Sequence, residues 1–161
     1  MTALSRTNAR PPLYTTEERA RRDASIWTLV QGILAPVQFL AFGVSLVLVM
    51  RFLVTGIGYE AATISILVKT AFLFLIMITG AIWEKVVFGQ YLFAPAFFWE
   101  DVFSFAVIAL HSLYLWALWT GSMSPRDMML VALAAYATYV VNAGQFIWKL
   151  RQARLDQRGR A

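Results

Sequence analysis

The stretch Trp83-Glu-Lys-Val-Val-Phe-Gly-Gln-Tyr-Leu-Phe-Ala-Pro-Ala-Phe-Phe-Trp-Glu-Asp101 lies between two long apolar segments, and it sets how they can be arranged. It contains seven aromatic side chains, three carboxylates and one lysine. A carboxylate among aromatic side chains at a membrane boundary loses hydration, which raises its pKa and favours the protonated form. A protonated carboxyl group can act as a general acid near neutral pH. The stretch is therefore a candidate active site, although aromatic residues also anchor ordinary spans at membrane interfaces.

The composition indicates a membrane protein. Of the 161 residues, 60% are hydrophobic, whereas a soluble domain is roughly half apolar. Four apolar segments, at about 26–54, 60–83, 99–120 and 127–149, are each long enough to cross a bilayer. Basic residues lie before the first apolar segment and after the last one, so the positive-inside rule places both termini in the cytoplasm. We predict an all-α integral membrane protein, a four-transmembrane-helix bundle with both termini cytoplasmic, in which the 83–101 loop also faces the cytoplasm.

This pattern divides the chain into three regions. Residues 1–25 form a cytoplasmic N-terminal segment, of which residues 1–13 are expected to be disordered. Thr15 and Glu18 have the spacing of a helix-capping box, which predicts a short interfacial helix through Asp23. Residues 26–149 form the four-helix membrane domain, and residues 150–161 form a basic cytoplasmic tail. No signal peptide is expected, because no small-residue cleavage site closes the first apolar segment.

Several classes of function do not fit this composition. The absence of cysteine excludes disulfides, thiolate metal sites and iron–sulfur clusters, and a single histidine excludes a bis-histidine haem site. The net charge of +5 belongs to residues that flank the spans, so it does not indicate a nucleic-acid partner. The sequence also contains no phosphate-binding glycine loop and no Ser-His-Asp arrangement whose members can be placed together.

Polar side chains inside the apolar segments are expected to face the bundle rather than lipid. In the first span, Gln31, Gln38 and Ser45 recur every seven residues and therefore share one helix face. Depth along the helices predicts two polar layers. The layer near the midplane holds Gln38, Lys69, His111 and Thr138. The layer nearer the cytoplasm holds Gln31, Glu84, Glu100, Asp101, Asn142 and Gln145.

The sequence leaves more than one role open for each of these polar residues. His111 suits a magnesium ligand, a proton-transfer group or a hydrogen-bonded packing residue. Lys69 lies roughly 12 Å below the external end of its span, so it is expected to pair with a substrate carboxylate or a protein acid. Acids at positions 100 and 101 also suit a helix start. Glu84 suits a local ion pair with Lys85.

Several stretches resemble the 3-vinyl (bacterio)chlorophyllide hydratases, membrane enzymes of bacteriochlorophyll biosynthesis in photosynthetic bacteria. They are 27–39, 59–65, 134–145, Trp83-Glu-Lys-Val-Val-Phe-Gly89 and Phe93-Ala-Pro-Ala-Phe-Phe-Trp-Glu-Asp-Val-Phe103. The resemblance covers about residues 12–155. It implies a hydro-lyase that adds water to the C3 vinyl group of chlorophyllide a and gives the 3-(1-hydroxyethyl) derivative. It also implies a multi-pass protein of the bacterial inner or intracytoplasmic membrane.

The chemistry suggests roles for the polar and aromatic residues. We expect Glu100 or Asp101 to deliver a proton, with Glu84 as the next candidate, while His111 orients water or ligates the substrate's magnesium. No cofactor or protein-bound metal is expected, because the substrate carries its own Mg. The expected substrate-binding residues are lysines for the propionate, aromatic side chains for the macrocycle and amides lining the cavity: Lys69, Lys85, Tyr91, Phe97, Phe98, Trp99, Gln38, Asn142 and Gln145.

The expected partners are chlorophyllide a and membrane lipid, with no nucleic acid, and the sequence leaves a homo-oligomer open. A different class of function uses the same pocket: a non-catalytic pigment carrier or assembly factor for chlorophyllide. Such a carrier would use the aromatic side chains and has no use for several acids at the pocket mouth.

Overall fold

The computed structural model describes residues 12–158, and this part of the chain forms five helices. They are α1 (Thr16–Ala24), α2 (Ile26–Thr55), α3 (Tyr59–Phe88), α4 (Phe98–Thr120) and α5 (Pro125–Arg158). Most of the segment predicted to be disordered, residues 1–11, lies outside the described residues.

Helices α2, α3, α4 and α5 are each long and apolar enough to cross a membrane, which confirms the prediction of an all-helical protein with four candidate spans. Two helices continue past their predicted ends. Helix α3 runs to Phe88, where Gly89 ends it in a left-handed conformation with φ of +85°. Helix α5 continues through the predicted basic tail to Arg158, because no glycine or proline interrupts it after Gly144.

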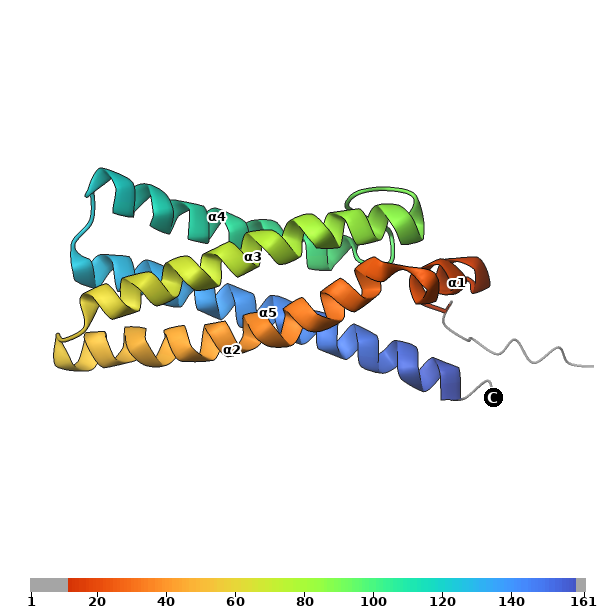
Figure 1. Ribbon diagram of the computed structural model, residues 1–161, viewed down its shortest axis with the longest axis horizontal. Coiled ribbons are helices and arrows are strands. Elements are labelled where there is room, and N and C mark those ends of the chain that lie inside the picture. The colour runs from red at the N-terminus through yellow and green to blue at the C-terminus, as the bar shows by residue number, and fades with distance from the viewer. Residues whose placement is uncertain (1–11, 159–161) are drawn as a thin grey trace, which may run out of the picture.

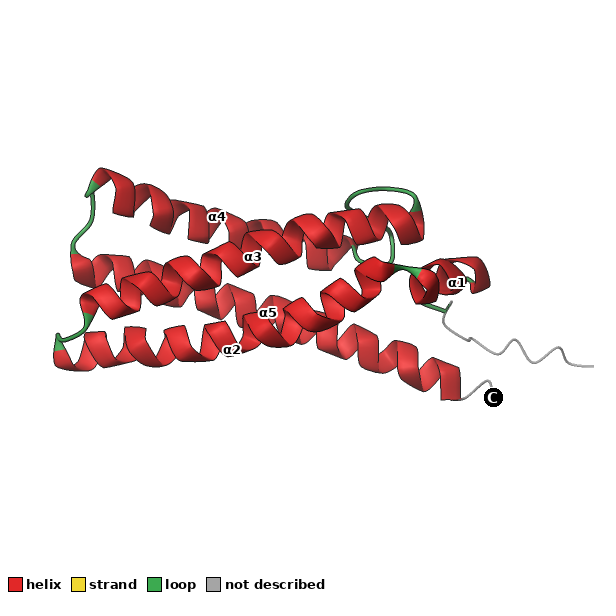
Figure 2. Ribbon diagram, viewed as in Figure 1, coloured by secondary structure: helices red, strands yellow, loops and turns green. Residues whose placement is uncertain are grey.

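The four long helices lie side by side in one bundle (Figure 1). Helix α2 packs mainly on α3 and α4 mainly on α5, while contacts of α2 with α5 and of α3 with α4 join the two pairs. Two short connections lie at one end of the bundle. Helix α1, the 89–97 loop and the C-terminal end of α5 lie at the other (Figures 1 and 2). We call this second end the loop end.

The main apolar core fills the space between α2, α3, α4 and α5. Phe42 of α2 contacts two tyrosines of α5, with ring centroids 5.4 Å from Tyr136 and 5.1 Å from Tyr139. These contacts hold two aromatic rings of α5 beside the polar residues of α3 and α4 described below.

A second, smaller core closes the loop end. Tyr14 is buried there and stacks on Phe88 at 5.8 Å. Burial raises the pKa of the Tyr14 hydroxyl, while the neighbouring Arg22 guanidinium acts in the opposite direction. The Arg21 side chain donates a hydrogen bond of 2.8 Å to the carbonyl of Val87. These contacts fasten the segment before α1, and α1 itself, to the end of α3.

The predicted capping box at the start of α1 is confirmed. The Thr15 hydroxyl accepts from the Glu18 N–H at 3.2 Å, and the Glu18 carboxylate accepts from the Thr15 N–H at 2.7 Å. The helix that it starts ends at Ala24, one residue beyond the predicted limit.

Candidate active site

Three buried carboxyl groups meet at the loop end of the bundle. Glu84 lies on the last turns of α3, and Glu100 and Asp101 lie on the first turn of α4. All three are no more than 5% exposed. Asp and Glu are almost never fully buried unless they are paired. Their partners therefore determine what this cluster can do.

Glu84 and Asp101 form a carboxyl pair that holds the 89–97 loop. The Phe93 N–H donates to Asp101 Oδ2 at 2.6 Å, and the Ala94 N–H donates to Glu84 Oε2 at 3.3 Å. The two side chains are also close enough to interact with each other. Two carboxyl groups in such contact favour a state that shares one proton, because two ionised groups would repel each other. The shorter backbone bond to Asp101 favours its ionised form, so Glu84 is the better candidate to carry that proton.

The backbone at Phe93 is strained. Its φ of +60° lies in the left-handed region, which is uncommon for bulky residues and costs about 1 kcal/mol or more. The bond from its N–H to Asp101 fixes this conformation. The Phe93 ring then lies outside the bundle, stacked on Phe105 at 5.6 Å and beside Phe98 at 5.6 Å. One residue thus joins the carboxyl pair to an exposed aromatic surface.

Glu100 is ionised and paired with Lys149 of α5. The Lys149 ammonium lies 2.6 Å from Glu100 Oε2, donates to the carbonyl of Ala96 and lies 5.0 Å from the centroid of the Phe97 ring. An ammonium in direct contact stabilises the charged form of a carboxylate. Of the three acids, Glu100 is therefore the least suited to donate a proton.

Polar contacts continue from Glu100 into the bundle. The Ser104 hydroxyl donates to the carbonyl of Glu100 at 2.8 Å, and the Asn142 amide donates to Ser104 Oγ at 2.8 Å. Within the described chain, the side-chain oxygens of Asn142 and Gln145 are buried without a hydrogen-bond partner. Buried acceptors of this kind suit water or a polar ligand atom. Asn142, predicted for the layer nearer the cytoplasm, is thus linked to Glu100 through Ser104.

Lys69 and His111 form a separate polar pair deeper in the bundle. Lys69 Nζ lies 2.6 Å from His111 Nε2, and both side chains are almost completely buried. His111 Nδ1 lies 2.8 Å from the carbonyl of Val107, so Nδ1 carries a proton and Nε2 accepts from Lys69. The Lys69 amine also faces the rings of Tyr139 and Tyr136, at 4.4 and 5.2 Å. The structure brings together two residues of the predicted midplane layer, and it occupies both histidine nitrogens.

The predicted polar face of α2 does turn toward the bundle. Gln31 donates to Thr79 Oγ1 at 2.7 Å, and Ser45 Oγ lies 2.8 Å from Ser65 Oγ. Gln38 is 1% exposed, and its side-chain oxygen is buried without a partner among the described residues. Thr138, by contrast, bonds to carbonyls of its own helix.

The aromatic residues expected to pack on the macrocycle occupy two environments. Phe97 is buried in the small core at the loop end, where it stacks on Phe146 at 5.8 Å. Tyr91, Phe98 and Trp99 are exposed by 61%, 43% and 65%, so only these three present ring surface to an incoming ligand.

The two lysines expected to bind a propionate lie in different environments. Lys85 is exposed and donates to the carbonyl of Gly89 at 2.8 Å, whereas Lys69 is enclosed in the bundle. The ion pairs found among residues 12–158 are Arg22–Asp23 and Lys149–Glu100, so the local Glu84–Lys85 pair does not form there.

Two features of the site did not come from sequence reasoning. The role of Lys149 as the partner of Glu100 was not predicted, although its spacing from Asn142 and Gln145 had placed it on the same helix face. Nothing in the sequence signalled the left-handed backbone of Phe93, because this conformation is usual for glycine. Within residues 12–158, no group of three or more His, Asp or Glu side chains is arranged to hold a metal ion.

Comparisons with known proteins identify the family of this chain. The family model for 2-vinyl bacteriochlorophyllide hydratase matches residues 14–152. A 2-vinyl bacteriochlorophyllide hydratase from Rhodobacter capsulatus is 79% identical over 149 residues, which cover 92% of this chain and 86% of the relative. One from Cereibacter sphaeroides is 73% identical over 145 residues, 89% of each chain. No solved structure matches the chain. With the match spanning all four long helices and the buried acids, the chain belongs to the 2-vinyl bacteriochlorophyllide hydratase family, whose members are hydro-lyases.

Proposed function

We propose that this chain adds water to the 3-vinyl group of chlorophyllide a and releases the 3-(1-hydroxyethyl) derivative. The relatives are named for a 2-vinyl group, and position 2 in the older tetrapyrrole numbering is position 3 in the current one. The observation that carries the mechanism is the buried pair of Glu84 and Asp101, whose carboxylate oxygens accept from the N–H groups of Ala94 and Phe93 in an aromatic loop.

The reaction begins with proton transfer from the pair to the terminal vinyl carbon. The vinyl π bond supplies the electrons for the new C–H bond, and the cation forms on the carbon attached to the macrocycle, whose π system delocalises it. The pair, now fully ionised, lies beside this cation and stabilises it electrostatically. Water attacks the cationic carbon and returns its proton to the pair. One water is consumed and the pair regains its starting state.

This cycle explains why two carboxyl groups are needed rather than one. The charged second carboxylate keeps the shared proton on the pair near neutral pH, so that a general acid is available. The dicarboxylate left after proton transfer is then a strong base for the attacking water. No electrons are exchanged with a cofactor, so we propose that none is required. The Mg of the substrate remains a part of the substrate throughout.

The loop end also supports the proposed placement in the cell. Basic residues of α1 and α5 gather there, including Arg21, Arg22, Lys149 and Arg151. We propose that this end and both termini face the cytoplasm of a bacterial inner or intracytoplasmic membrane. The substrate then approaches from the cytoplasmic boundary, along the exposed rings of Phe98 and Trp99.

The test is incubation of the purified protein in detergent with chlorophyllide a, followed by chromatography and mass analysis. We expect a product heavier by one water without added nucleotide or metal. Glu84→Gln and Asp101→Asn should each lower turnover by about 10²-fold or more, while Glu60→Gln, which removes an exposed acid at the opposite end of α3, should not.

Each contrary result has a definite meaning. Full activity in both amide variants would refute the carboxyl pair as the proton donor. Tight pigment binding by the folded protein without any hydrated product would instead favour the carrier or assembly factor.

A further inference from the structure

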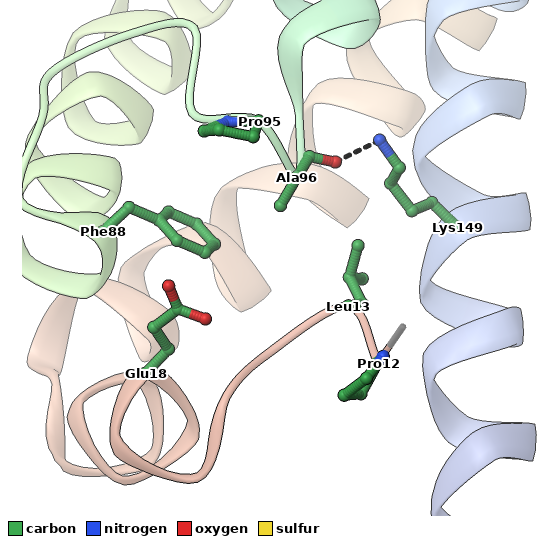
Figure 3. Close-up of a pocket in the computed structure, with 7 residues that line it drawn as sticks. All are labelled: Pro12, Leu13, Glu18, Phe88, Pro95, Ala96 and Lys149. Carbon is green, nitrogen blue, oxygen red and sulfur yellow. Dashed lines mark hydrogen bonds between the residues drawn. The ribbon is translucent and has the colours of Figure 1, made fainter. Parts of the chain in front are cut away.

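A cavity of about 430 Å³ opens at the loop end, where Lys149, the partner of the buried Glu100, forms part of its wall (Figure 3). Its walls come from segments far apart in sequence. The apolar walls are Pro12 and Leu13 before α1, Phe88 at the end of α3 and Pro95 in the loop. Its volume falls in the range of small-molecule pockets, roughly 300–1,000 Å³.

Two charged residues line this cavity, and only one of them is free to meet a ligand. The Glu18 carboxylate is used by the capping box of its own helix, where it accepts from Thr15. Lys149 reaches across from α5 toward the loop, as Figure 3 shows. Its ammonium has three hydrogens, of which the carbonyl of Ala96 and the carboxylate of Glu100 take two. Among the described residues no acceptor takes the third, and the Phe97 ring centroid lies 5.0 Å from the ammonium.

We propose that Lys149 binds the carboxylate side chain of the tetrapyrrole substrate in this cavity. The inference rests on the proposed function and names the anchor that orients the substrate. An apolar cavity with one cation at its wall suits a flat, largely apolar molecule with one anionic group. A partly buried ammonium forms a strong, charge-assisted bond with such a group.

The location of Lys149 explains why it would control orientation. Its partner Glu100 is the neighbour in sequence of Asp101, a member of the proton-donating pair. A rigid macrocycle fixes the distance between its carboxylate and its vinyl group. Anchoring the carboxylate at Lys149 therefore restricts where the vinyl group can lie relative to Glu84 and Asp101. By comparison, Lys85 is exposed and Lys69 is enclosed in the bundle, whereas Lys149 lines this cavity.

The experiment compares two forms of one substrate, chlorophyllide a with its free propionic acid and the methyl ester of that acid. We expect the wild-type protein to prefer the free acid by about tenfold or more in kcat/KM, mainly through KM, because the ester cannot accept a charge-assisted bond. Lys149→Met should abolish this preference, so that acid and ester have equal kcat/KM whatever the absolute rate of the variant. Lys149→Arg should keep most of it, and Arg151→Gln, which removes an exposed charge from the same helix, should keep all of it.

Thermal unfolding in detergent shows whether each variant folds, so the acid-to-ester ratio is compared only between folded proteins. If Lys149→Met fails to fold with Glu100 unpaired, Lys149→Met/Glu100→Gln removes both charges, and the same ratio is measured. Equal use of acid and ester by the wild type, or a preserved preference in the folded Lys149→Met variant, would overturn the inference. If neither pigment is hydrated, the proposed function fails, and the acid-to-ester ratio of pigment affinity then decides the role of Lys149.

Discussion

The buried pair of Lys69 and His111 allows a prediction about stability. Lys69→Met removes the donor that lies 2.6 Å from His111 Nε2, and among the described residues it leaves this buried acceptor unpaired. Such a group costs about 1–3 kcal/mol. His111→Leu leaves the Lys69 amine facing only the rings of Tyr136 and Tyr139, which should cost about the same or more.

The double variant Lys69→Met/His111→Leu should be far less destabilised than the sum of the two single variants. It removes both polar partners and fills their space with apolar side chains of similar size, a change that is often neutral or stabilising in a buried site. We therefore expect a coupling free energy of about 2 kcal/mol between the two positions.

The assay is thermal or denaturant unfolding, in the same detergent, of the wild type, the two single variants and the double variant. The four free energies of unfolding together give the coupling free energy. Additive effects, within about 0.5 kcal/mol, would refute the view that each residue is retained as the other's partner. The variant Arg151→Gln is the control, because its exposed side chain lies outside this pair.

Turnover of the double variant tests a second point. Ten residues separate Asp101 from His111 along α4, about 15 Å at the rise of an α-helix. If the carboxyl pair performs the chemistry, the folded double variant should hydrate chlorophyllide a within a few-fold of wild type. Loss of turnover without loss of fold would support the prediction that His111 orients water or ligates magnesium.

Three further predictions concern the stability of the loop end and its neighbouring helices, each measured by unfolding in detergent. Gly89→Ala should lower the free energy of unfolding by about 1 kcal/mol, because φ is +85° there. Gly144→Ala should raise it by about 0.5–1 kcal/mol, because Gly144 lies inside α5 with open space around its Cα. Equal effects of the two substitutions would contradict this reasoning. Phe97→Ala should cost about 3–5 kcal/mol because the ring is buried, and the exposed Phe98→Ala should cost much less. Thr15→Ala should cost about 1 kcal/mol and speed proteolysis near α1; unchanged proteolysis would show that its capping box does not hold the helix.

Some of the site could be foreseen because helical periodicity is written in the sequence. Gln38 and Ser45 recur every seven residues, and both are buried against the bundle. Lys69 and His111 were expected at one depth, and their nitrogens lie 2.6 Å apart. Depth and face follow from a constant rise and turn per residue, so these properties need no knowledge of the neighbouring helices.

The identity of each polar partner could not be foreseen in the same way. Glu84 lies beside Lys85 in sequence, yet its carboxyl group meets Asp101 and the Ala94 N–H. Glu100 was one of the two residues first expected to donate the proton, yet it is paired with Lys149. Which side chains meet depends on how far each helix is rotated and shifted against the next, and on the path of the 89–97 loop.

By itself, the sequence determined that this chain forms four long apolar helices, that acids and aromatic residues gather at one connection, and that it resembles a family of vinyl hydratases. Local composition and periodicity suffice for these properties, because a bilayer requires long apolar helices. Only the tertiary structure decided which acids share a proton and which lysine borders an open cavity. Both properties depend on contacts of a few ångströms between residues distant in sequence. These contacts are determined by the packing of α3, α4 and α5 and by the strained loop at Phe93.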